Sequence, residues 1–264
     1  MPLIVGTSGW QYRDWRGVLY PDGLPQRAWL HRYADEFPAV EVNNAFYRLP
    51  ERAVFERWRA ETPAGFVVAV KVSRYLTHIK RLREPAEPVA RLTARAEGLG
   101  DRLGPYLLQL PPTLRGAPDA LDACLACFPP GARVAVEPRH ESWWNDEVRD
   151  VLARRGAALC WADRLGRPAT PLWRTADWGY VRMHEGTASP RPSYGRTALA
   201  TWLDRIDTAW PLMPHGADVF VFFNNDRGGA AVRNARTLRR MAGRRGRCVL
   251  EEKAVPDPGK ASKT

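Results

Sequence analysis

Short apolar runs recur along the chain, and segments with helical periodicity lie between most of them. The runs are rich in Val, Ile, Leu, Ala and aromatic residues, and most are apolar on both faces, as strands of a covered parallel sheet are. Eight strands are predicted: Leu3–Gly6, Val40–Asn43, Phe66–Val72, Tyr106–Leu110, Arg133–Glu137, Ala157–Ala162, Gly179–Met183 and Asp218–Phe223. Strands that alternate with helices indicate a parallel sheet joined by crossover helices.

Amphipathic segments supply the helices of this alternation. The predicted helices are Gln26–Glu36, Glu51–Ala60, Pro88–Leu103, Asp119–Phe128, Glu141–Arg155, Arg196–Pro211 and Ala230–Gly243, while Arg164–Asp177, rich in Pro, Gly and Thr, is predicted to be a loop. Eight βα units in about 250 residues have the size and rhythm of a TIM-type barrel. We therefore expect an α/β fold with a single (β/α)8 barrel domain over residues 1–253 and a flexible C-terminal tail over residues 254–264.

The connection after the first strand, residues 7–25, is long for a barrel. It contains four aromatic residues, Trp10, Tyr12, Trp15 and Tyr20. Packing of the loop explains this aromatic content better than ligand binding does. Trp10 is nevertheless kept as a candidate that could stack on a sugar or a base.

The composition is that of a globular chain, with 45% hydrophobic and 26% charged residues in 264. It excludes a disordered tail protein, a fibrous repeat and a disulfide scaffold. The 40 basic and 29 acidic side chains give a formal net charge of +11. Nearly all of this excess is local, because residues 227–247 contain eight Arg and no acidic residue. The charge therefore points to a contact with polyanions at one helix, rather than to a basic surface overall.

The N-terminus lacks a basic segment followed by an apolar one, and no apolar run approaches the ~18 residues of a membrane span. A cytoplasmic protein is expected, and four cysteines agree with that compartment. Cys124 and Cys127 form a Cys-x-x-Cys pair on an apolar helix face. Because there is no second pair, a structural role is favoured over a zinc or redox site.

Polar residues end every predicted strand, where the active sites of such barrels lie. Alternation along a strand predicts which of them share a face with the interior residues. Phasing on Val5, for example, selects Thr7, and phasing on Trp161 selects Asp163. The predicted mouth contains Thr7, Glu41, Asn43, Lys71, Gln109, Glu137, Arg139, Asp163, Arg182, His184 and Asn224. Buried charge is costly, so a functional site is favoured over structural salt bridges such as Glu41–Lys71 or Glu137–Arg182, which stay the alternative.

Several motifs at these strand ends resemble the YecE-like family. They are Gly6-Thr7-Ser8-Gly9-Trp10, Glu41-Val42-Asn43-Asn44 followed by Phe46-Tyr47-Arg48-Leu49-Pro50, Lys71-Val72-Ser73 with Thr77-His78, Gln109-Leu110-Pro111-Pro112, Glu137-Pro138-Arg139-His140 with Trp143, Arg182-x-His184, and Phe223-Asn224-Asn225. The motifs cover residues 4–240 in the order of the family. The resemblance implies a TIM-barrel fold and a family without an established biochemical function. The chain departs from the family pattern at Ala45, where Thr is usual, and at Glu185, which separates His184 from Gly186.

The favoured hypothesis is a mouth that binds a small anionic ligand, phosphate-bearing or nucleotide-like, and uses general acid–base chemistry as a phosphoester-type hydrolase or lyase. Cationic side chains would orient the ligand, and Glu137, His184 or Asp163 would move protons. The candidate substrate-binding residues are Glu41, Asn43, Lys71, His78, Gln109, Arg139, Arg182, Asn224, Asn225 and Trp10, with Arg48 on an adjoining loop. The Asn224–Gly229 turn could also present a helix N-terminus to a phosphate, or simply start the last helix.

A metal-dependent, endonuclease-like hydrolase is one alternative. Glu137, Asp163 and His184 end three successive strands, with Glu41, His78 and His140 in reserve. Carboxylate and imidazole ligands suit a divalent metal. Lys71, Arg139 and Arg182, which are predicted to lie at the same barrel mouth, would repel such a cation. No metal and no other cofactor is therefore predicted. Glycoside hydrolysis is disfavoured, because strands four and seven do not end in the two facing carboxylates that this reaction needs.

A non-catalytic nucleic-acid-binding protein is the other alternative, through the basic last helix. Val232, Ala235, Leu238 and Met241 recur at helical spacing and are expected to face the barrel. The arginines expected to point outward, or to follow the helix, are Arg233, Arg236, Arg239, Arg240, Arg244, Arg245 and Arg247. A solvated helix face is the simpler explanation of the same pattern.

Overall fold

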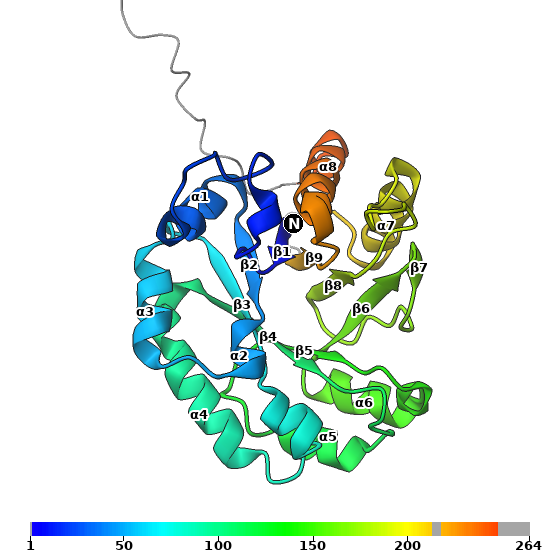
Figure 1. The fold of residues 1–264 in the computed structure, drawn as a ribbon. Coiled ribbons are helices and arrows are strands. Elements are labelled where there is room, and N and C mark those ends of the chain that lie inside the picture. Colours follow the sequence, from blue (N-terminus) through cyan, green and yellow to red (C-terminus); the bar gives the residue numbers. More distant parts are fainter. Residues whose placement is uncertain (1, 213–217, 248–264) are drawn as a thin grey trace, which may run out of the picture.

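Eight parallel strands close into a barrel in the part of the chain that the computed structural model describes, residues 2–212 and 218–247 (Figure 1). The barrel strands are β1 (Leu3–Ser8), β2 (Ala39–Val42), β3 (Val67–Lys71), β4 (Leu103–Gln109), β5 (Val134–Glu137), β6 (Ala158–Arg164), β8 (Gly179–Met183) and β9 (Val219–Phe223). Neighbours in the barrel are neighbours in the chain, and β9 pairs with β1 to close the ring. The predicted (β/α)8 fold is confirmed.

Helices surround the barrel and cover its outer face (Figure 1). They are α1 (Trp29–Glu36), α3 (Arg52–Ala60), α4 (Ala86–Ala96), α5 (Pro118–Leu125), α6 (Asp146–Arg154), α7 (Arg196–Ala209) and α8 (Ala230–Arg244). The short helix α2 (Asn44–Tyr47) follows the carboxyl end of β2. Residues that favour a helix N-terminus mark where two of these helices begin. Asn145 caps α6 by accepting a hydrogen bond from the Val148 amide at 3.0 Å, and α5 begins with Pro118.

The helix predicted over Pro88–Leu103 ends earlier than expected. The α-helix stops at Ala96, a 3₁₀ segment runs over Glu97–Arg102, and β4 begins at Leu103 rather than at Tyr106. Gly100 has a φ of 53° inside this segment, a conformation that interrupts helical hydrogen bonding. The two glycines in this stretch therefore end the helix and return the chain to the sheet.

Three short elements were not predicted. The strand β7 (Arg167–Pro168) pairs antiparallel with β6 in a region expected to be a loop. The helix α2 and a π-helical turn over Tyr75–Ile79 follow β2 and β3. Elements of two to five residues are too short to show a periodic pattern in the sequence, so periodicity could not predict them.

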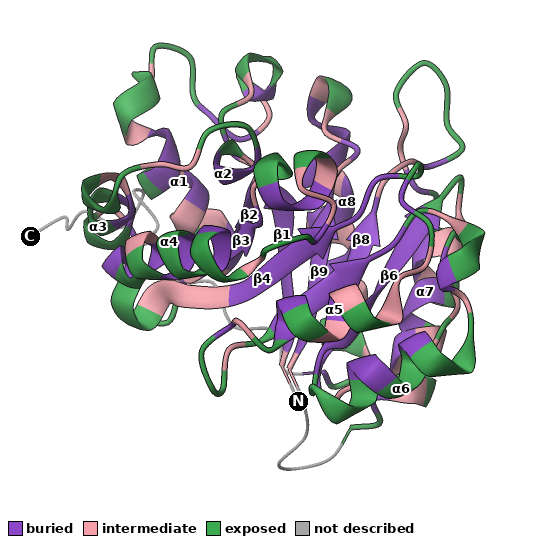
Figure 2. Cartoon of the chain, turned by 90° about the horizontal axis from the view of Figure 1, so that it is seen from below, coloured by how far each residue is buried: buried purple, intermediate pink, exposed green. Residues whose placement is uncertain are grey.

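Small side chains from some strands and large ones from others fill the barrel interior together. Small residues come from β2, β3, β5 and β6, and bulky ones from β8 and β9; the interior cluster includes Ile4, Ala39, Ala69, Leu107, Ala135, Ala158, Cys160, Tyr180, Phe220 and Phe222. The strands are buried along most of their length (Figure 2). At Gly6 a Cβ atom would lie 2.0 Å from the Ala39 carbonyl oxygen, so only glycine allows β1 and β2 to approach this closely.

Two strands present the opposite face from the one predicted. Ile4 lies inside the barrel, so Ser8 faces the mouth and Thr7 points outward, where its amide and hydroxyl lie 2.9 Å from the Tyr33 hydroxyl. The phasing of β1 on Val5 was wrong.

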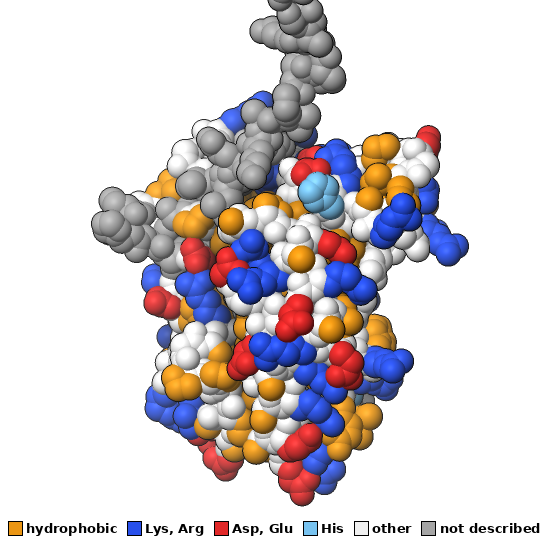
Figure 3. All heavy atoms as spheres, turned by 90° about the vertical axis from the view of Figure 1, so that its left-hand side faces the viewer, with side chains coloured by type: hydrophobic (Ala, Val, Ile, Leu, Met, Phe, Trp, Pro, Cys, Tyr) orange, Lys and Arg blue, Asp and Glu red, His pale blue; other side chains and the backbone are white. Residues whose placement is uncertain are grey.

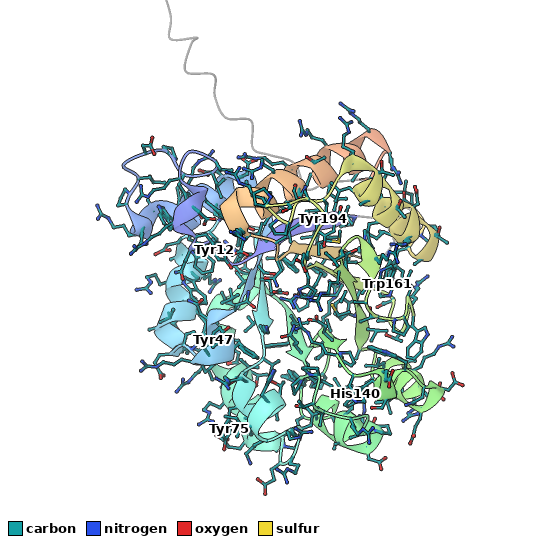
Figure 4. The ribbon with its side chains drawn as sticks, turned by 45° about the vertical axis from the view of Figure 1, so that its right-hand side comes forward. Tyr12, Tyr47, Tyr75, His140, Trp161 and Tyr194 are labelled. Atoms are coloured by element: carbon teal, nitrogen blue, oxygen red, sulfur yellow. The ribbon has the colours of Figure 1, made fainter. Side chains whose placement is uncertain are left out.

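On β6, Ala158 and Cys160 lie inside the barrel, so Trp161 and Asp163 point toward the helices. Trp161, labelled in Figure 4, packs against Trp210 with ring centroids 4.6 Å apart. The prediction placed the bulky residue inside. The aromatic rings of β8 and β9 already occupy that space, and small side chains are left for β6.

The long loop after β1 forms a compact aromatic layer beside the barrel. Trp15 and Tyr20 are buried, and the Tyr20 ring stacks on Trp29 with centroids 4.5 Å apart. Trp10 is only 4% exposed and meets Trp58 edge to face at 5.4 Å. The loop therefore packs as expected, but Trp10 lies in its core and does not offer a free ring to a ligand.

The remaining sequence expectations concern membranes, cysteines and the tail. Within the described residues, no helix combines the length and the apolar character needed to cross a bilayer. Cys124 is buried on α5, and burial raises the pKa of its thiol to about 12, as expected for a structural residue. The predicted tail, residues 254–264, lies outside the described residues.

Candidate functional site

A buried arginine bridges two buried carboxylates at the carboxyl ends of the strands. Arg182 on β8 donates from Nη1 to Oε2 of Glu137 on β5 and from Nη2 to Oε1 of Glu41 on β2, each at 2.7 Å. None of the three side chains is more than 1% exposed. The alternation of β2, β5 and β8 aims all three at the barrel axis, as predicted.

Every oxygen of the two carboxylates accepts further hydrogen bonds. Glu41 accepts from the Ser8 and Tyr180 hydroxyls, both at 2.7 Å. Glu137 accepts from the Gln109 amide at 2.7 Å and from Arg139 Nη2 at 3.2 Å, and its Oε1 lies 2.8 Å from His184 Nε2. The two carboxylates therefore act as acceptors that are already satisfied.

These contacts fix the charges of the central residues. Burial alone would raise the pKa of Glu137, but the charges of Arg182 and His184 outweigh it and hold that pKa well below its usual value. Burial also opposes ionisation of Glu41, and Arg182 and Lys71 reverse it, so that its pKa is lowered too. Glu137 is thus held in its ionised form by its partners, and the proton-carrying role that the sequence suggested for it stays a prediction.

His184 lies between this carboxylate and the open side of the mouth. Its Nε2 faces Glu137, and its Nδ1 lies 3.1 Å from the Asn224 side-chain amide. An ionised Glu137 requires a proton on Nε2, which leaves Nδ1 as the acceptor in the neutral ring. The carboxylate therefore sets the orientation and tautomer of a histidine that lines the cleft.

Lys71 extends from β3 into the same mouth without a polar partner. It is 8% exposed, and its Nζ lies 4.2 Å from the centroid of the Phe46 ring. Within the described residues, Nζ makes no hydrogen bond and no ion pair. Burial and then the Arg182 charge lower the pKa of Lys71 to about 8, and the opposing charges of Glu41 and Glu137 offset this only in part.

A cleft of about 640 Å³ opens beside His184 and Glu137. Arg139 lies at its edge with 42% of its side chain exposed, and within the described residues its single polar contact is Glu137. The exposed Arg164 and Arg227 also line the cleft, the first in an ion pair with Glu185 at 3.7 Å. The remaining lining residues are Pro112, Pro138, Ala162, Ala169, Thr170, Pro192, Asn224, Asn225 and Asp226.

Asp163 does not belong to this site. It accepts hydrogen bonds from the Tyr194 hydroxyl, from Trp202 Nε1 at 2.7 Å and from the Gly166 amide at 3.2 Å on the helix side of the barrel. Burial raises its pKa, and the hydrogen bonds from Tyr194 and Trp202 partly offset this. Its predicted role as an acid or base at the mouth was wrong, because β6 faces the other way.

The predicted metal triad is separated for the same reason. In residues 2–212 and 218–247 no group of three or more His, Cys, Asp or Glu side chains could hold a metal ion. Of the reserve ligands, His78 packs edge to face on Phe46 at 5.1 Å, and His140 accepts from the Ser142 amide at 3.1 Å. The absence of a cofactor stays a prediction.

Two predicted binding residues occupy structural positions. Asn43 precedes α2 as its N-terminal cap residue, and Asn225 donates to the Pro192 carbonyl at 2.7 Å and to Asn234 Oδ1 at 2.9 Å. The helix N-terminus after Asn225 is already occupied, since Asp14 accepts from the Gly228 amide at 2.5 Å. The anion expected at this position is supplied by the chain itself.

The basic helix α8 is more enclosed than predicted. Arg239 is buried and donates to the Glu36 carbonyl, and Arg236 pairs with the Glu36 carboxylate at 2.8 Å. Arg245 pairs with Asp204 at 2.7 Å, and Arg247 is buried beside Asp207.

Arg233 bonds the Gly228 carbonyl at 2.6 Å, whereas Arg240 and Arg244 are exposed. On the face that carries α1 and α3, basic and acidic side chains are interspersed (Figure 3). Nucleic-acid binding stays a prediction, with a smaller free basic surface than the sequence suggested.

Sequence reasoning missed several residues of the site. Ser8 and Tyr180 complete the coordination of Glu41. Correct phasing of β1 on Ile4 would have identified Ser8, and Tyr180 already shared a face with Arg182. Arg164 ends β6 in phase with Ala158 and Cys160, so correct phasing of that strand would have identified it. Arg227 opens a short 3₁₀ segment, which carries no periodic signal.

Comparison with known proteins places this fold and site in a family context. A family model described as "Protein of unknown function DUF72" matches residues 4–260. The UPF0759 protein YecE of Escherichia coli K12 is 30% identical over 156 residues, which are 58% of this chain and 54% of YecE, so the match spans about half the length of that relative. The UPF0759 protein YunF of Bacillus subtilis is 23% identical over 268 residues, covering 89% of this chain and 93% of YunF.

Two solved structures share the architecture. A DUF72 family protein from Thermotoga maritima superposes with a TM-score of 0.77 at 26% identity, over 92% of this chain and 100% of that one. A DUF72 family protein from Enterococcus faecalis gives a TM-score of 0.76 at 18% identity, over 91% and 95% of the two chains. The second likeness shows the fold alone.

Proposed function

The chain belongs to the DUF72 family, whose function is not established, and we propose that its barrel mouth binds a small anionic metabolite and acts on it by general acid–base chemistry. The ligand would carry a phosphate or a carboxylate, and the reaction would be of the phosphoester hydrolase or lyase type. Arg139 binds the anion, His184 moves the proton, and Glu137 positions both.

The observation that carries this proposal is that the charged donors at the mouth, and not its two buried carboxylates, have hydrogen-bonding groups left unused. Both carboxylates are satisfied, whereas Arg139 and Lys71 keep donors without a protein partner in the described residues. The five charges of the inner ring are three cations, Lys71, Arg139 and Arg182, and two anions, Glu41 and Glu137. A ligand anion would balance this charge and accept the unused hydrogen bonds.

The contacts of His184 support its role as the acid–base residue. A water molecule or ligand hydroxyl that replaces the Asn224 amide at Nδ1 could give its proton to the ring. The ionised Glu137 at Nε2 would then stabilise the imidazolium, as a carboxylate does when it is paired with a catalytic histidine. The same ring returns the proton to the leaving group in the second half of the reaction.

Calorimetric titration with a panel of small anions tests the binding step. The panel contains inorganic phosphate, sugar phosphates, nucleoside monophosphates and oxo acids, each beside a neutral analogue. The Arg139→Gln variant should bind the preferred anion about 10- to 100-fold more weakly, as expected for the loss of one charge-assisted hydrogen bond. Arg154→Gln is the matched control, because Arg154 is exposed and, in the described part of the chain, its one ion pair is with Asp122 at 4.0 Å. Binding that is equal in both variants, or absent for every anion, would overturn the proposal.

Turnover assays test the proton-transfer step separately. With the anion that binds best, His184→Asn should retain affinity within about threefold and lose turnover by about 10²- to 10⁴-fold, the usual contribution of a general acid–base group. Glu137→Gln should retain part of the rate, because it weakens the orientation of His184 without removing the ring. Full activity of the His184 variant would exclude the assigned role.

A further inference from the structure

We propose that Lys71 is a nucleophilic amine that forms an imine with a carbonyl group of the substrate, which makes the substrate an oxo acid or a phosphorylated aldehyde or ketone. The inference rests on the proposed function, because the anionic group of such a molecule would be held by Arg139. It selects the lyase branch over phosphoester hydrolysis. Two observations about the mouth carry it, the isolation of Nζ and its place in the charge ring.

The first observation is that the Lys71 ammonium has no hydrogen-bond acceptor among the residues that the structure describes. The oxygens of Glu41 and Glu137 are taken by Arg182, Arg139, His184 and uncharged donors, and Nζ lies over the Phe46 ring, 4.2 Å from its centroid. A structural lysine at this depth normally ends on a carboxylate or a carbonyl, because a desolvated ammonium without an acceptor is costly. Arg182 has the structural role here, and Lys71 remains available.

The second observation is the position of Lys71 relative to the cleft. The parallel register of the strands sets this position. Lys71 on β3 pairs with Leu107 on β4, and Gln109, two residues further along β4, pairs with Glu137 on β5. Lys71 interacts electrostatically with Glu137 and Arg139, both of which line the cleft. Lys71 itself is buried, with 8% of its surface exposed.

The surroundings of Lys71 favour the neutral, nucleophilic form of the amine. Burial first, and then the charge of Arg182, lowers its pKa to about 8. At pH 7 roughly a tenth of the side chains would be neutral, compared with fewer than about one in a thousand for an ordinary lysine. A desolvated lysine beside another cation is a recognised way to activate this nucleophile.

The covalent step is balanced without a further reagent. The Nζ lone pair attacks the carbonyl carbon, and the carbonyl electron pair moves to oxygen and takes a proton. The carbinolamine then loses water as the C=N bond forms, so amine and carbonyl give imine and one water. His184 is the group that can supply and remove these protons. The protonated imine accepts the electron pair of a bond to the adjacent carbon when that bond breaks, which is lyase chemistry.

Reductive trapping tests the proposal on the intact chain. The protein is incubated with sodium cyanoborohydride and one of four carbonyl probes: pyruvate, glyoxylate, glyceraldehyde 3-phosphate or the neutral propanal. Peptide mapping by mass spectrometry then locates the reduced adduct. Lys80 is the internal control, because it is the other lysine in the described residues and is paired with Glu84. Lys71 should be labelled roughly a hundredfold faster than Lys80 at pH 7.5, in line with its larger neutral fraction.

The variants separate this proposal from the proposed function. Lys71→Met should lose the mapped adduct, and Lys80→Met should keep it. Arg139→Gln should slow labelling by the three anionic probes about tenfold and leave labelling by propanal unchanged. Anion binding without labelling of Lys71 by any probe would refute the imine and keep the proposed function. Suppose that propanal labels Lys71 and that the anionic probes label wild type and Arg139→Gln at equal rates. This result would support the reactive amine of Lys71 and refute anion binding by Arg139. Labelling of Lys71 and Lys80 at equal rates would refute the special reactivity, and this comparison needs only the wild-type chain.

Discussion

The Nη1 atom of Arg182 lies 2.7 Å from Oε2 of Glu137, and both side chains are almost completely buried. The same guanidinium reaches Glu41, so one cation holds two carboxylates at the base of the mouth. Burying these charges is unfavourable unless all three are present. The site therefore depends on Arg182 for its geometry, although Arg182 itself is too enclosed to be the first contact of a ligand.

Arg182→Met should destabilise the protein strongly. The substitution leaves two buried carboxylates without their cation, and breaking a buried pair in this way typically costs about 3–5 kcal/mol. Denaturation by urea, followed by circular dichroism, measures the change. The exposed Arg154→Met variant should stay within about 0.5 kcal/mol of wild type. Equal midpoints for the two variants would show that the bridge contributes nothing to folding.

Stability should fall steeply in acid. The pKa values of Glu41 and Glu137 are lowered in the folded protein, so the unfolded chain binds protons more readily than the folded one. Their contribution is fully present above the unfolded pKa of about 4.3 and is lost as the pH falls through the folded values. Urea midpoints measured from about pH 2.5 to pH 7 should show this loss. In Glu137→Gln the acid slope should be shallower, and an unchanged slope would contradict the assignment.

The barrel and most of its mouth were predictable because the sequence pattern reflects burial. The strands are apolar on both faces, and Glu41, Glu137 and Arg182 interrupt them in phase with interior residues. A charge at such a position can persist only if it is paired or used. The Glu137–Arg182 pair that the sequence offered as a structural alternative is present, whereas Glu41 pairs with Arg182 instead of Lys71. Alternation places these charges on one face of their strands but does not decide which cation reaches Glu41.

Two strands show what alternation cannot decide. The phase of β6 depends on which side has room for Trp161, and that is set by Tyr180 and Phe222 from strands later in the chain. The burial of Arg239 is likewise set by residues that are distant in the sequence. Its periodicity places it at the edge of the apolar face of α8, and only the packing of α1 against that edge encloses it.

Asp163→Asn should lower stability without affecting ligand binding. Asp163 accepts hydrogen bonds from the Tyr194 hydroxyl and from Trp202 Nε1 on the helix side of the barrel. In the Asn variant, the side-chain NH2 group would face one of these two donors, which would then lose its acceptor. The loss of one buried hydrogen bond with an unsatisfied partner costs about 1–3 kcal/mol. Chemical denaturation and calorimetry with the preferred anion measure the two effects, with the exposed Asp150→Asn as the control. A tenfold loss of anion affinity in a folded Asp163→Asn protein would return this residue to the site.

Arg239→Gln and Arg240→Gln remove the same charge from adjacent positions of α8 but should differ in stability. Arg239 is 9% exposed, donates to the Glu36 carbonyl and lies 5.8 Å from the Phe37 ring centroid. Arg240 is exposed, and its one polar contact among the described residues is Thr237 at 3.4 Å. The first change should cost about 1–3 kcal/mol, through the lost hydrogen bond and the lost packing of the arginine stem, and the second less than about 0.5 kcal/mol.

Salt-dependent binding to a short DNA duplex, measured by fluorescence anisotropy, completes this comparison. If α8 contacts polyanions through its exposed side, Arg240→Gln should weaken that binding and Arg239→Gln should not, as long as the variant is folded. Equal weakening by both would mean that Arg239 leaves its place over Phe37 to reach the phosphates. Similar stability of the two variants would contradict the enclosed position of Arg239 and restore the fully basic face that the sequence suggested.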